Sequence, residues 1–142
     1  MDDQAVTFAK LAPSNSRFQR LRAELGLSGF GMNLITLQPG QRGRIHAHER
    51  QEEVYLVLEG QLGLGVEGEH HTLGRYDVVR IAPHVRRQLA NVSPEPVVIL
   101  AMGASGTHLD SGKDGRAWES WDDHGPGRPT ADVPMPDDID LA

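Results

Sequence analysis

The sequence predicts an all-β domain, built as a small antiparallel sandwich or barrel. From Phe30 onward, short apolar runs follow one another at near-regular spacing, and glycine, proline or Ser-Pro turn signals separate them. Short alternating runs with this punctuation are typical of antiparallel β structure. A chain of 142 residues suits one domain with one core. A small barrel of this kind encloses a cavity that a small ligand can enter.

The segment before the predicted strands is expected to be peripheral. Residues 5–8 alternate as a short peripheral strand would. Ser14 or Ser16 could cap a short amphipathic helix in the stretch RFQRLRAELG, which Gly26 would end. Three arginines are interpreted as the solvated face of this helix: Arg17, Arg20 and Arg22. Residues 1–27 are therefore predicted to form an N-terminal arm with one short helix.

The main domain is predicted to span residues 28–103 and to contain eight strands. Pro39-Gly40, Glu67-Gly68 and Ser93-Pro94 are among the turn signals between the runs. In chain order the runs are 30–40, 42–48, 53–60, 61–69, 70–74, 77–83, 86–92 and 96–102. Every second side chain of such a strand points into the domain.

Residues 104–142 are predicted to form an acidic tail, rich in proline and glycine. Nine acidic and three basic side chains in residues 103–142 give a charge of −6, equal to that of the whole chain. Trp118 and Trp121 lie three residues apart, so they are expected to share one face of a helical turn. We expect them to dock on the main domain or on a partner subunit, and the residues after them to be disordered or draped over the surface.

The composition also excludes several classes of protein. The chain has no cysteine, which rules out disulfides, thiolate metal sites and a cysteine nucleophile. No apolar run is long enough to cross a membrane, and the acidic residues Asp2 and Asp3 do not fit a signal peptide. No basic patch with interleaved aromatic residues supports nucleic-acid binding. A cytoplasmic protein without membrane or nucleic-acid partners is therefore predicted.

One stretch contains a candidate metal site. His46 and His48 are two residues apart, so both imidazoles point to the same face of a strand. Glu53 opens the next run after a short polar break, and a hairpin would bring its carboxylate beside the two rings. Two imidazoles and one carboxylate form a ligand set for iron, manganese, nickel or zinc.

This stretch resembles the first conserved motif of the cupin family at every fixed position: Gly40, His46, His48, Glu53 and Gly60. Gly74, Asp77, Pro83 and Asn91 also fit the second cupin motif. The resemblance covers about residues 30–102 and implies a single cupin jelly-roll barrel in a homodimer. It also implies a fourth, histidine ligand, but Arg87 stands at that position, and His84 occupies a turn position that is usually glycine.

Arg87 leaves three alternatives for the site. It could pair with Glu53 and take the place of the metal, because guanidinium stays charged and has no lone pair for an ion. It could instead hold an anionic substrate beside a metal bound by three ligands. If the strand register slips, Arg87 would turn outward and Gln88 would face the site.

Three functional classes remain. The first is an isomerase, epimerase or cyclase in which His46, His48 or Tyr55 moves protons and Arg87, Gln88 and Tyr55 bind an anionic metabolite. The second is a metal-dependent dioxygenase that uses His46, His48 and Glu53 as ligands. The third is a non-catalytic module that binds or senses a metabolite. The sequence identifies neither the substrate nor the metal.

Overall fold

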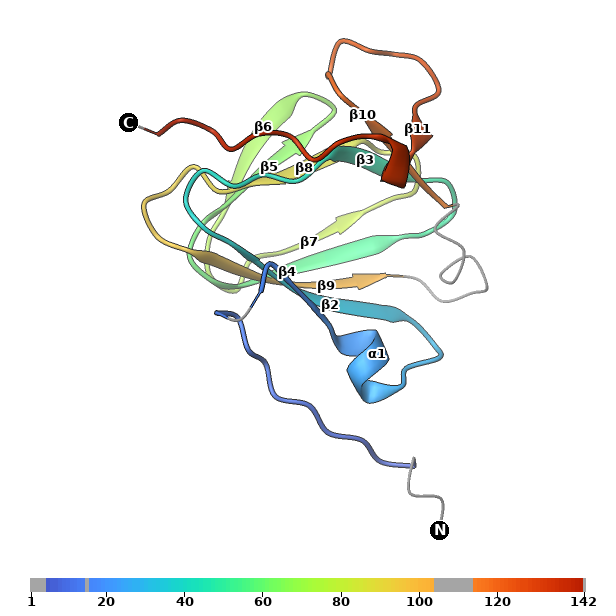
Figure 1. The fold of residues 1–142 in the computed structure, drawn as a ribbon, viewed down its shortest axis with the longest axis vertical. Helices are drawn as coiled ribbons and strands as arrows, with labels where there is room; N and C mark the ends of the chain where they lie inside the picture. Colours follow the sequence, from blue (N-terminus) through green and yellow to red (C-terminus); the bar gives the residue numbers. More distant parts are fainter. Residues whose placement is uncertain (1–4, 15, 104–113, 142) are drawn as a thin grey trace.

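The computed structural model describes residues 5–14, 16–103 and 114–141, which form two antiparallel sheets and little helix. Strands β1 (Phe18–Arg20), β2 (Gly31–Leu37), β9 (Val97–Gly103), β4 (Glu53–Glu59) and β7 (Val78–Ile81) make a five-stranded sheet in that order. The six-stranded sheet has the order β11 (Arg128–Pro129), β10 (Gly115–Trp118), β3 (Ile45–His48), β8 (Arg87–Ala90), β5 (Leu62–Val66) and β6 (Glu69–Leu73). The all-β prediction is confirmed, and the two sheets face each other as in a jelly roll (Figure 1).

The main core fills the space between the sheets. Its fully buried members come from both sheets and include Leu37, Tyr55, Val57, Leu62 and Ile99. Burial of an aliphatic side chain of this size stabilises a fold by about 1.5–3 kcal/mol, so these layers supply much of the stability.

A second, smaller core lies on the other face of the five-stranded sheet. Helix α1 (Leu21–Leu25) places Leu21 against Leu34 and Val98. The helix covers this face in Figure 1. Although α1 is only five residues long, it covers the second face of the five-stranded sheet in this region.

Two glycines of the cupin-like motif are required by the backbone. Gly40 has φ +87°, and a Cβ there would lie 2.7 Å from the carbonyl oxygen of Ile139. Gly60 has φ +80°, and a Cβ there would lie 2.3 Å from the carbonyl oxygen of Pro96. Any other residue would be strained at these positive φ values, and its side chain would also clash with the adjacent backbone segment of the same chain.

The N-terminal segment differs from its prediction in two ways. Residues 5–8 form no strand, and the expected helix begins only at Leu21 because Phe18–Arg20 pair with β2 as strand β1. Gly26 ends the helix in the left-handed conformation, as expected. Tertiary pairing with β2 overrides the helical period here. None of the described helices is long and apolar enough to cross a membrane.

The C-terminal region joins the six-stranded sheet. Strand β10 pairs with β3, so Trp118 ends a strand and the predicted helical turn for Trp118 and Trp121 is wrong. Beyond η2 (Thr130–Asp132), the chain runs beside residues 40–44, where Ile139 N donates to Gly40 O at 2.7 Å. Arg42 and Arg44 also donate to carbonyl oxygens of this segment.

Candidate metal centre

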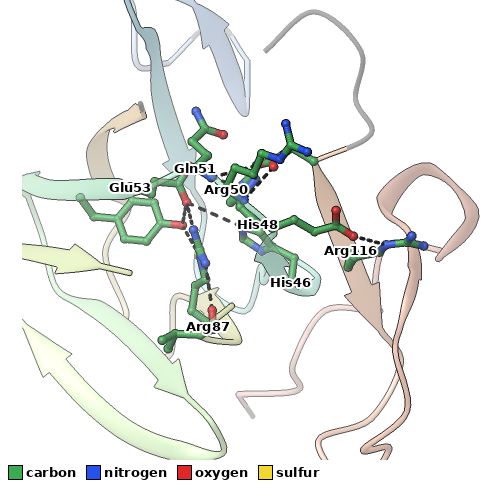
Figure 2. A network of polar contacts seen from close by, with 11 residues as sticks. His46, His48, Arg50, Gln51, Glu53, Arg87 and Arg116 are labelled. Atoms are coloured by element: carbon green, nitrogen blue, oxygen red, sulfur yellow. Dashed lines mark hydrogen bonds and ion pairs between the residues drawn. The ribbon is translucent and has the colours of Figure 1, made fainter. Parts of the chain in front are cut away.

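Three side chains predicted to bind a metal converge between the sheets. His46 and His48 lie on β3, and Glu53 begins β4 on the facing sheet. His46 Nε2 lies 3.8 Å from Glu53 Oε1, and His48 Nε2 lies 3.8 Å from Glu53 Oε2. One potential ligand atom from each of the three residues lies within 4.8 Å of the other two, and the side chains converge as Figure 2 shows.

These separations are too long for hydrogen bonds, which need about 2.7–3.2 Å between heavy atoms. An ion bound at about 2.0–2.2 Å holds its ligand atoms about 3–4 Å apart. The geometry therefore leaves room for an ion between the three residues.

The far nitrogen of each histidine ring faces an acceptor. His46 Nδ1 lies 3.2 Å from the carbonyl oxygen of Arg44. His48 Nδ1 lies 3.2 Å from Asp114 Oδ2, although its direction falls outside hydrogen-bond geometry. An acceptor on the Nδ1 side favours a proton there and leaves Nε2 with its lone pair facing Glu53. Burial, offset in part by Glu53, lowers the pKa of His48, which also favours a neutral ring.

Arg87 points into the protein, not outward. Its side chain is 0% exposed, and Nη2 donates to Glu53 Oε1 at 2.8 Å. Nη1 donates to the carbonyl oxygen of Val85 at 2.9 Å, and Nε approaches the Tyr55 hydroxyl at 3.4 Å. The alternative with a slipped register is therefore wrong. The idea that Arg87 reaches out to hold a substrate is also not supported, because each of its three nitrogens already donates within the protein and the side chain does not line the cavity.

Arg87 and Tyr55 both bind the same oxygen of Glu53. The Tyr55 hydroxyl donates to Oε1 in a short hydrogen bond, so Oε2 stays directed toward His48. Burial alone would raise the pKa of Glu53, but His46, Arg87 and His48 outweigh it and hold that pKa well below its usual value. Burial and the Glu53 charge raise the pKa of Tyr55 well above its usual value. Glu53 thus stays ionised and Tyr55 stays protonated.

The remaining predicted residues lie elsewhere. Gln88 does not join the cluster: its amide donates to Gly43 O at 2.9 Å, and it lines a separate groove near Trp121. His84 is exposed in its turn with φ 73°, and its backbone N–H donates to His48 O. The positive φ explains why this turn usually carries glycine.

A cavity of about 420 Å³ opens beside the cluster. His46, His48, Glu53 and Tyr55 line it, so all four belong to one site. Sixteen residues contribute, including two from the C-terminal region, Thr130 and Met135. Arg17, Arg20 and Arg44 also line it, although the sequence-based interpretation had Arg17 and Arg20 on a solvated helix face. Because residues 17–20 were predicted to be helical, the sequence did not indicate that Arg17 and Arg20 line the cavity.

A family model described as a cupin domain matches residues 33–103, half of the chain. This chain is a cupin. The match includes His46, His48, Glu53 and Arg87 and extends over strands β3 to β9. This cupin thus carries the three candidate ligand residues of the first motif, and Arg87 stands where the resemblance implies a fourth, histidine ligand.

This cupin is similar to several known proteins. It is 31% identical over 101 residues to polyketide synthase CurC of Streptomyces cyaneus, a match over 67% of this chain and 65% of CurC, less than two thirds of that relative. A sugar phosphate isomerase of the cupin superfamily from Silicibacter pomeroyi is 28% identical, with a TM-score of 0.59 over 71% of this chain and 69% of that one. A cupin protein from Bacteroides fragilis is 26% identical, with a TM-score of 0.61 over 73% and 89%.

The residues present fit a divalent ion. The donor set is two imidazole nitrogens and one carboxylate oxygen, and the second nitrogen of each ring faces an acceptor. The Arg87 guanidinium opposes a cation nearby, but it occupies only Glu53 Oε1. This donor set suits iron, manganese, nickel or zinc without selecting one.

Proposed function

We propose that this cupin is a metal-dependent enzyme of the isomerase or cyclase type, which moves a proton on a small carbonyl compound bound in the cavity. One observation carries this proposal. The ligand atoms of His46, His48 and Glu53 converge beside the cavity at separations that suit an ion and not a hydrogen bond.

The side chains have distinct roles in this proposal. Nε2 of His46, Nε2 of His48 and the Glu53 carboxylate would hold the ion, while Arg87 and Tyr55 bind the Oε1 atom of that carboxylate. When bound, a divalent ion supplies Lewis acidity that polarises a carbonyl and acidifies the adjacent C–H. The Asp114 carboxylate lies 3.2 Å from the other ring nitrogen of His48, Nδ1.

The location of proton transfer follows from the other lining residues. Tyr55 keeps its proton because its pKa is raised, first by burial and then by Glu53, so it donates a hydrogen bond but is no base. Arginine, asparagine, threonine and apolar side chains make up the rest of the lining, and none is a base near neutral pH. Because His46, His48 and Glu53 would hold the ion, the proton would pass between the substrate and a solvent water at that end of the cavity.

The similar proteins are compatible with this reaction class. One is named a sugar phosphate isomerase and another a polyketide synthase. Sugar phosphates and polyketides both carry carbonyl groups next to C–H bonds that can lose a proton. The His-His-Glu set also suits a dioxygenase, so oxygen consumption belongs in the same test.

The test follows proton exchange in heavy water. Metal-loaded protein is incubated with 4-acetylbenzoate, acetoacetate and dihydroxyacetone phosphate, and loss of the signals next to the carbonyl is followed by proton NMR. We expect exchange on at least one compound, abolished in a His46→Ala/His48→Ala variant and retained in a His70→Ala/His71→Ala control, whose histidines are exposed on β6. The proposal would be contradicted if proton exchange on all three compounds were no faster with the unmodified protein than with the His46→Ala/His48→Ala variant. Oxygen uptake would instead identify a dioxygenase.

A further inference from the structure

The cavity beside the candidate metal centre is lined by more positive than negative side chains. Arg17, Arg20 and Arg44 line it, and among the residues that the structure describes Glu53 is the one acidic member of the lining. Glu53 is already paired with the buried guanidinium of Arg87. Within the described part of the cavity wall, the three arginines therefore have no acidic partner.

These arginines also have unused donors. The side chain of Arg20 makes no hydrogen bond or ion pair with any residue that the structure describes, and it is exposed. Arg17 donates through Nη2 to Arg42 O, but its buried Nε has no partner among the described residues. Arg44 uses Nε for the carbonyl oxygen of Val133 at 2.6 Å. Its terminal nitrogens make no further contact of this kind in the described part of the chain.

The arginines come from separate segments, and two of them, Arg17 and Arg44, repel each other. Arg17 and Arg20 flank or lie on β1, whereas Arg44 precedes β3 on the other sheet. Burial lowers the pKa of Arg17, and the charge of Arg44 lowers it further against the opposing effect of Asp138. Asp138 does not line the cavity. A bound anion would offset this repulsion and take up the unused donors.

The apolar side chains of the cavity wall indicate what the central part of a ligand would be like. Apolar side chains from both sheets and from the C-terminal segment line it: Phe18, Ile35, Leu37, Leu89, Ala101 and Met135. A fully polar ligand would lose its hydration against these side chains without replacement hydrogen bonds. The wall instead suits a ligand with an apolar body.

We propose that Arg17, Arg20 and Arg44 form an anion-binding subsite that selects substrates with a carboxylate or phosphate separated from the reacting carbonyl by an apolar segment. The reacting end of this substrate rests on the proposed function, whereas the anion subsite does not. It deepens that function by naming the substrate class.

The test measures binding by isothermal titration calorimetry with three matched compounds. The compounds are 4-acetylbenzoate, 4-acetylphenyl phosphate and the neutral methyl ester of 4-acetylbenzoate. We expect at least one anion to bind about tenfold or more tightly than the ester, because a hydrogen bond to a charged group contributes about 1.5–3 kcal/mol. The preferred anion shows whether the subsite takes carboxylate or phosphate.

Variants identify the residues responsible. Arg20→Gln is the clearest change because the Arg20 side chain has no partner in the described structure. We expect Arg20→Gln and Arg44→Gln each to weaken anion binding about tenfold and to leave ester binding unchanged. The control variant is Arg75→Gln. Arg75 is exposed and its guanidinium lies over the Tyr76 ring, so this variant should bind all three compounds as the unmodified chain does. Arg20→Lys should recover part of the anion affinity.

The outcomes separate this inference from the proposed function. Equal affinity for anions and ester, or unchanged anion binding by Arg20→Gln and Arg44→Gln, overturns the subsite. Selective anion binding that Arg20→Gln removes supports it, even if no proton exchange is ever seen. Exchange without anion selectivity would retain the proposed function and remove the subsite.

Discussion

Arg87 occupies the position where the second cupin motif carries a histidine ligand. On β8 it is the sheet partner of His46, which directs its side chain toward the candidate metal-binding residues. The sequence allowed an ion pair with Glu53, a substrate clamp or an outward rotamer. Burial and three engaged donors decide for the ion pair. The sequence could not decide because a one-residue change of register would have reversed the side chain.

The Arg87–Glu53 pair should be important for stability. In Arg87→Met, the buried Glu53 carboxylate loses its charged partner, so we expect the free energy of unfolding to fall by about 3–5 kcal/mol. Urea denaturation of chelator-treated protein measures the change. Adding Glu53→Gln should recover part of the loss because no unpaired charge is then buried.

A matched control is Arg80→Met. Arg80 also pairs with a glutamate, Glu52, but both side chains are largely exposed. Its loss should cost about 1 kcal/mol or less. If Arg87→Met costs no more than Arg80→Met, Arg87 does not neutralise Glu53 in the way described.

At the scale of elements, strand β10 and the segment after it hold Arg86 against the six-stranded sheet. The Arg86 guanidinium lies 5.3 Å from the Trp118 ring and 5.6 Å from the Trp121 ring. It pairs with Glu67 at 2.8 Å and donates to Asp123 O and Trp121 O. This one side chain therefore joins the β5–β6 turn to the C-terminal region.

Arg86→Ala should loosen that region. The chain contains only two tryptophans, and both lie against Arg86, so their fluorescence reports the contact directly. We expect a red shift of the emission maximum and faster trypsin cleavage after Arg116. Arg75→Ala removes a similar arginine contact from the exposed Tyr76 ring and should leave tryptophan emission unchanged. An unshifted spectrum in Arg86→Ala would show that other contacts hold the tryptophans.

The sequence predicted some elements better than others. Strands β2 to β9 could be predicted because glycine and proline turns separate alternating runs. Phe18–Arg20 and Gly115–Trp118 became strands through pairing with β2 and β3, which local patterns do not contain. The docking of Trp118 was expected, but the prediction that it lies on a helical turn was wrong because it ends strand β10.

At the scale of the whole molecule, the fold brings distant segments to one cavity. Arg20, Glu53 and Met135 all line it, although they lie far apart in the chain. The sequence could predict the His46–His48–Glu53 cluster because its members lie within eight residues of one another. The arginines and the C-terminal wall depend on tertiary contacts such as that of Ile139 with Gly40. The homodimer implied by the cupin resemblance stays a prediction.

We propose that His46, His48 and Glu53 hold a metal ion despite the nearby Arg87. The most direct measurement is elemental analysis of protein purified without chelator or affinity tag, then loaded in turn with Fe(II), Mn(II), Ni(II) and Zn(II). We predict about one ion per chain for at least one metal, lost in His46→Ala/His48→Ala and retained in His70→Ala/His71→Ala. No bound metal after all four loadings, or equal metal in the two double variants, would contradict the account and make Arg87 the replacement for the ion.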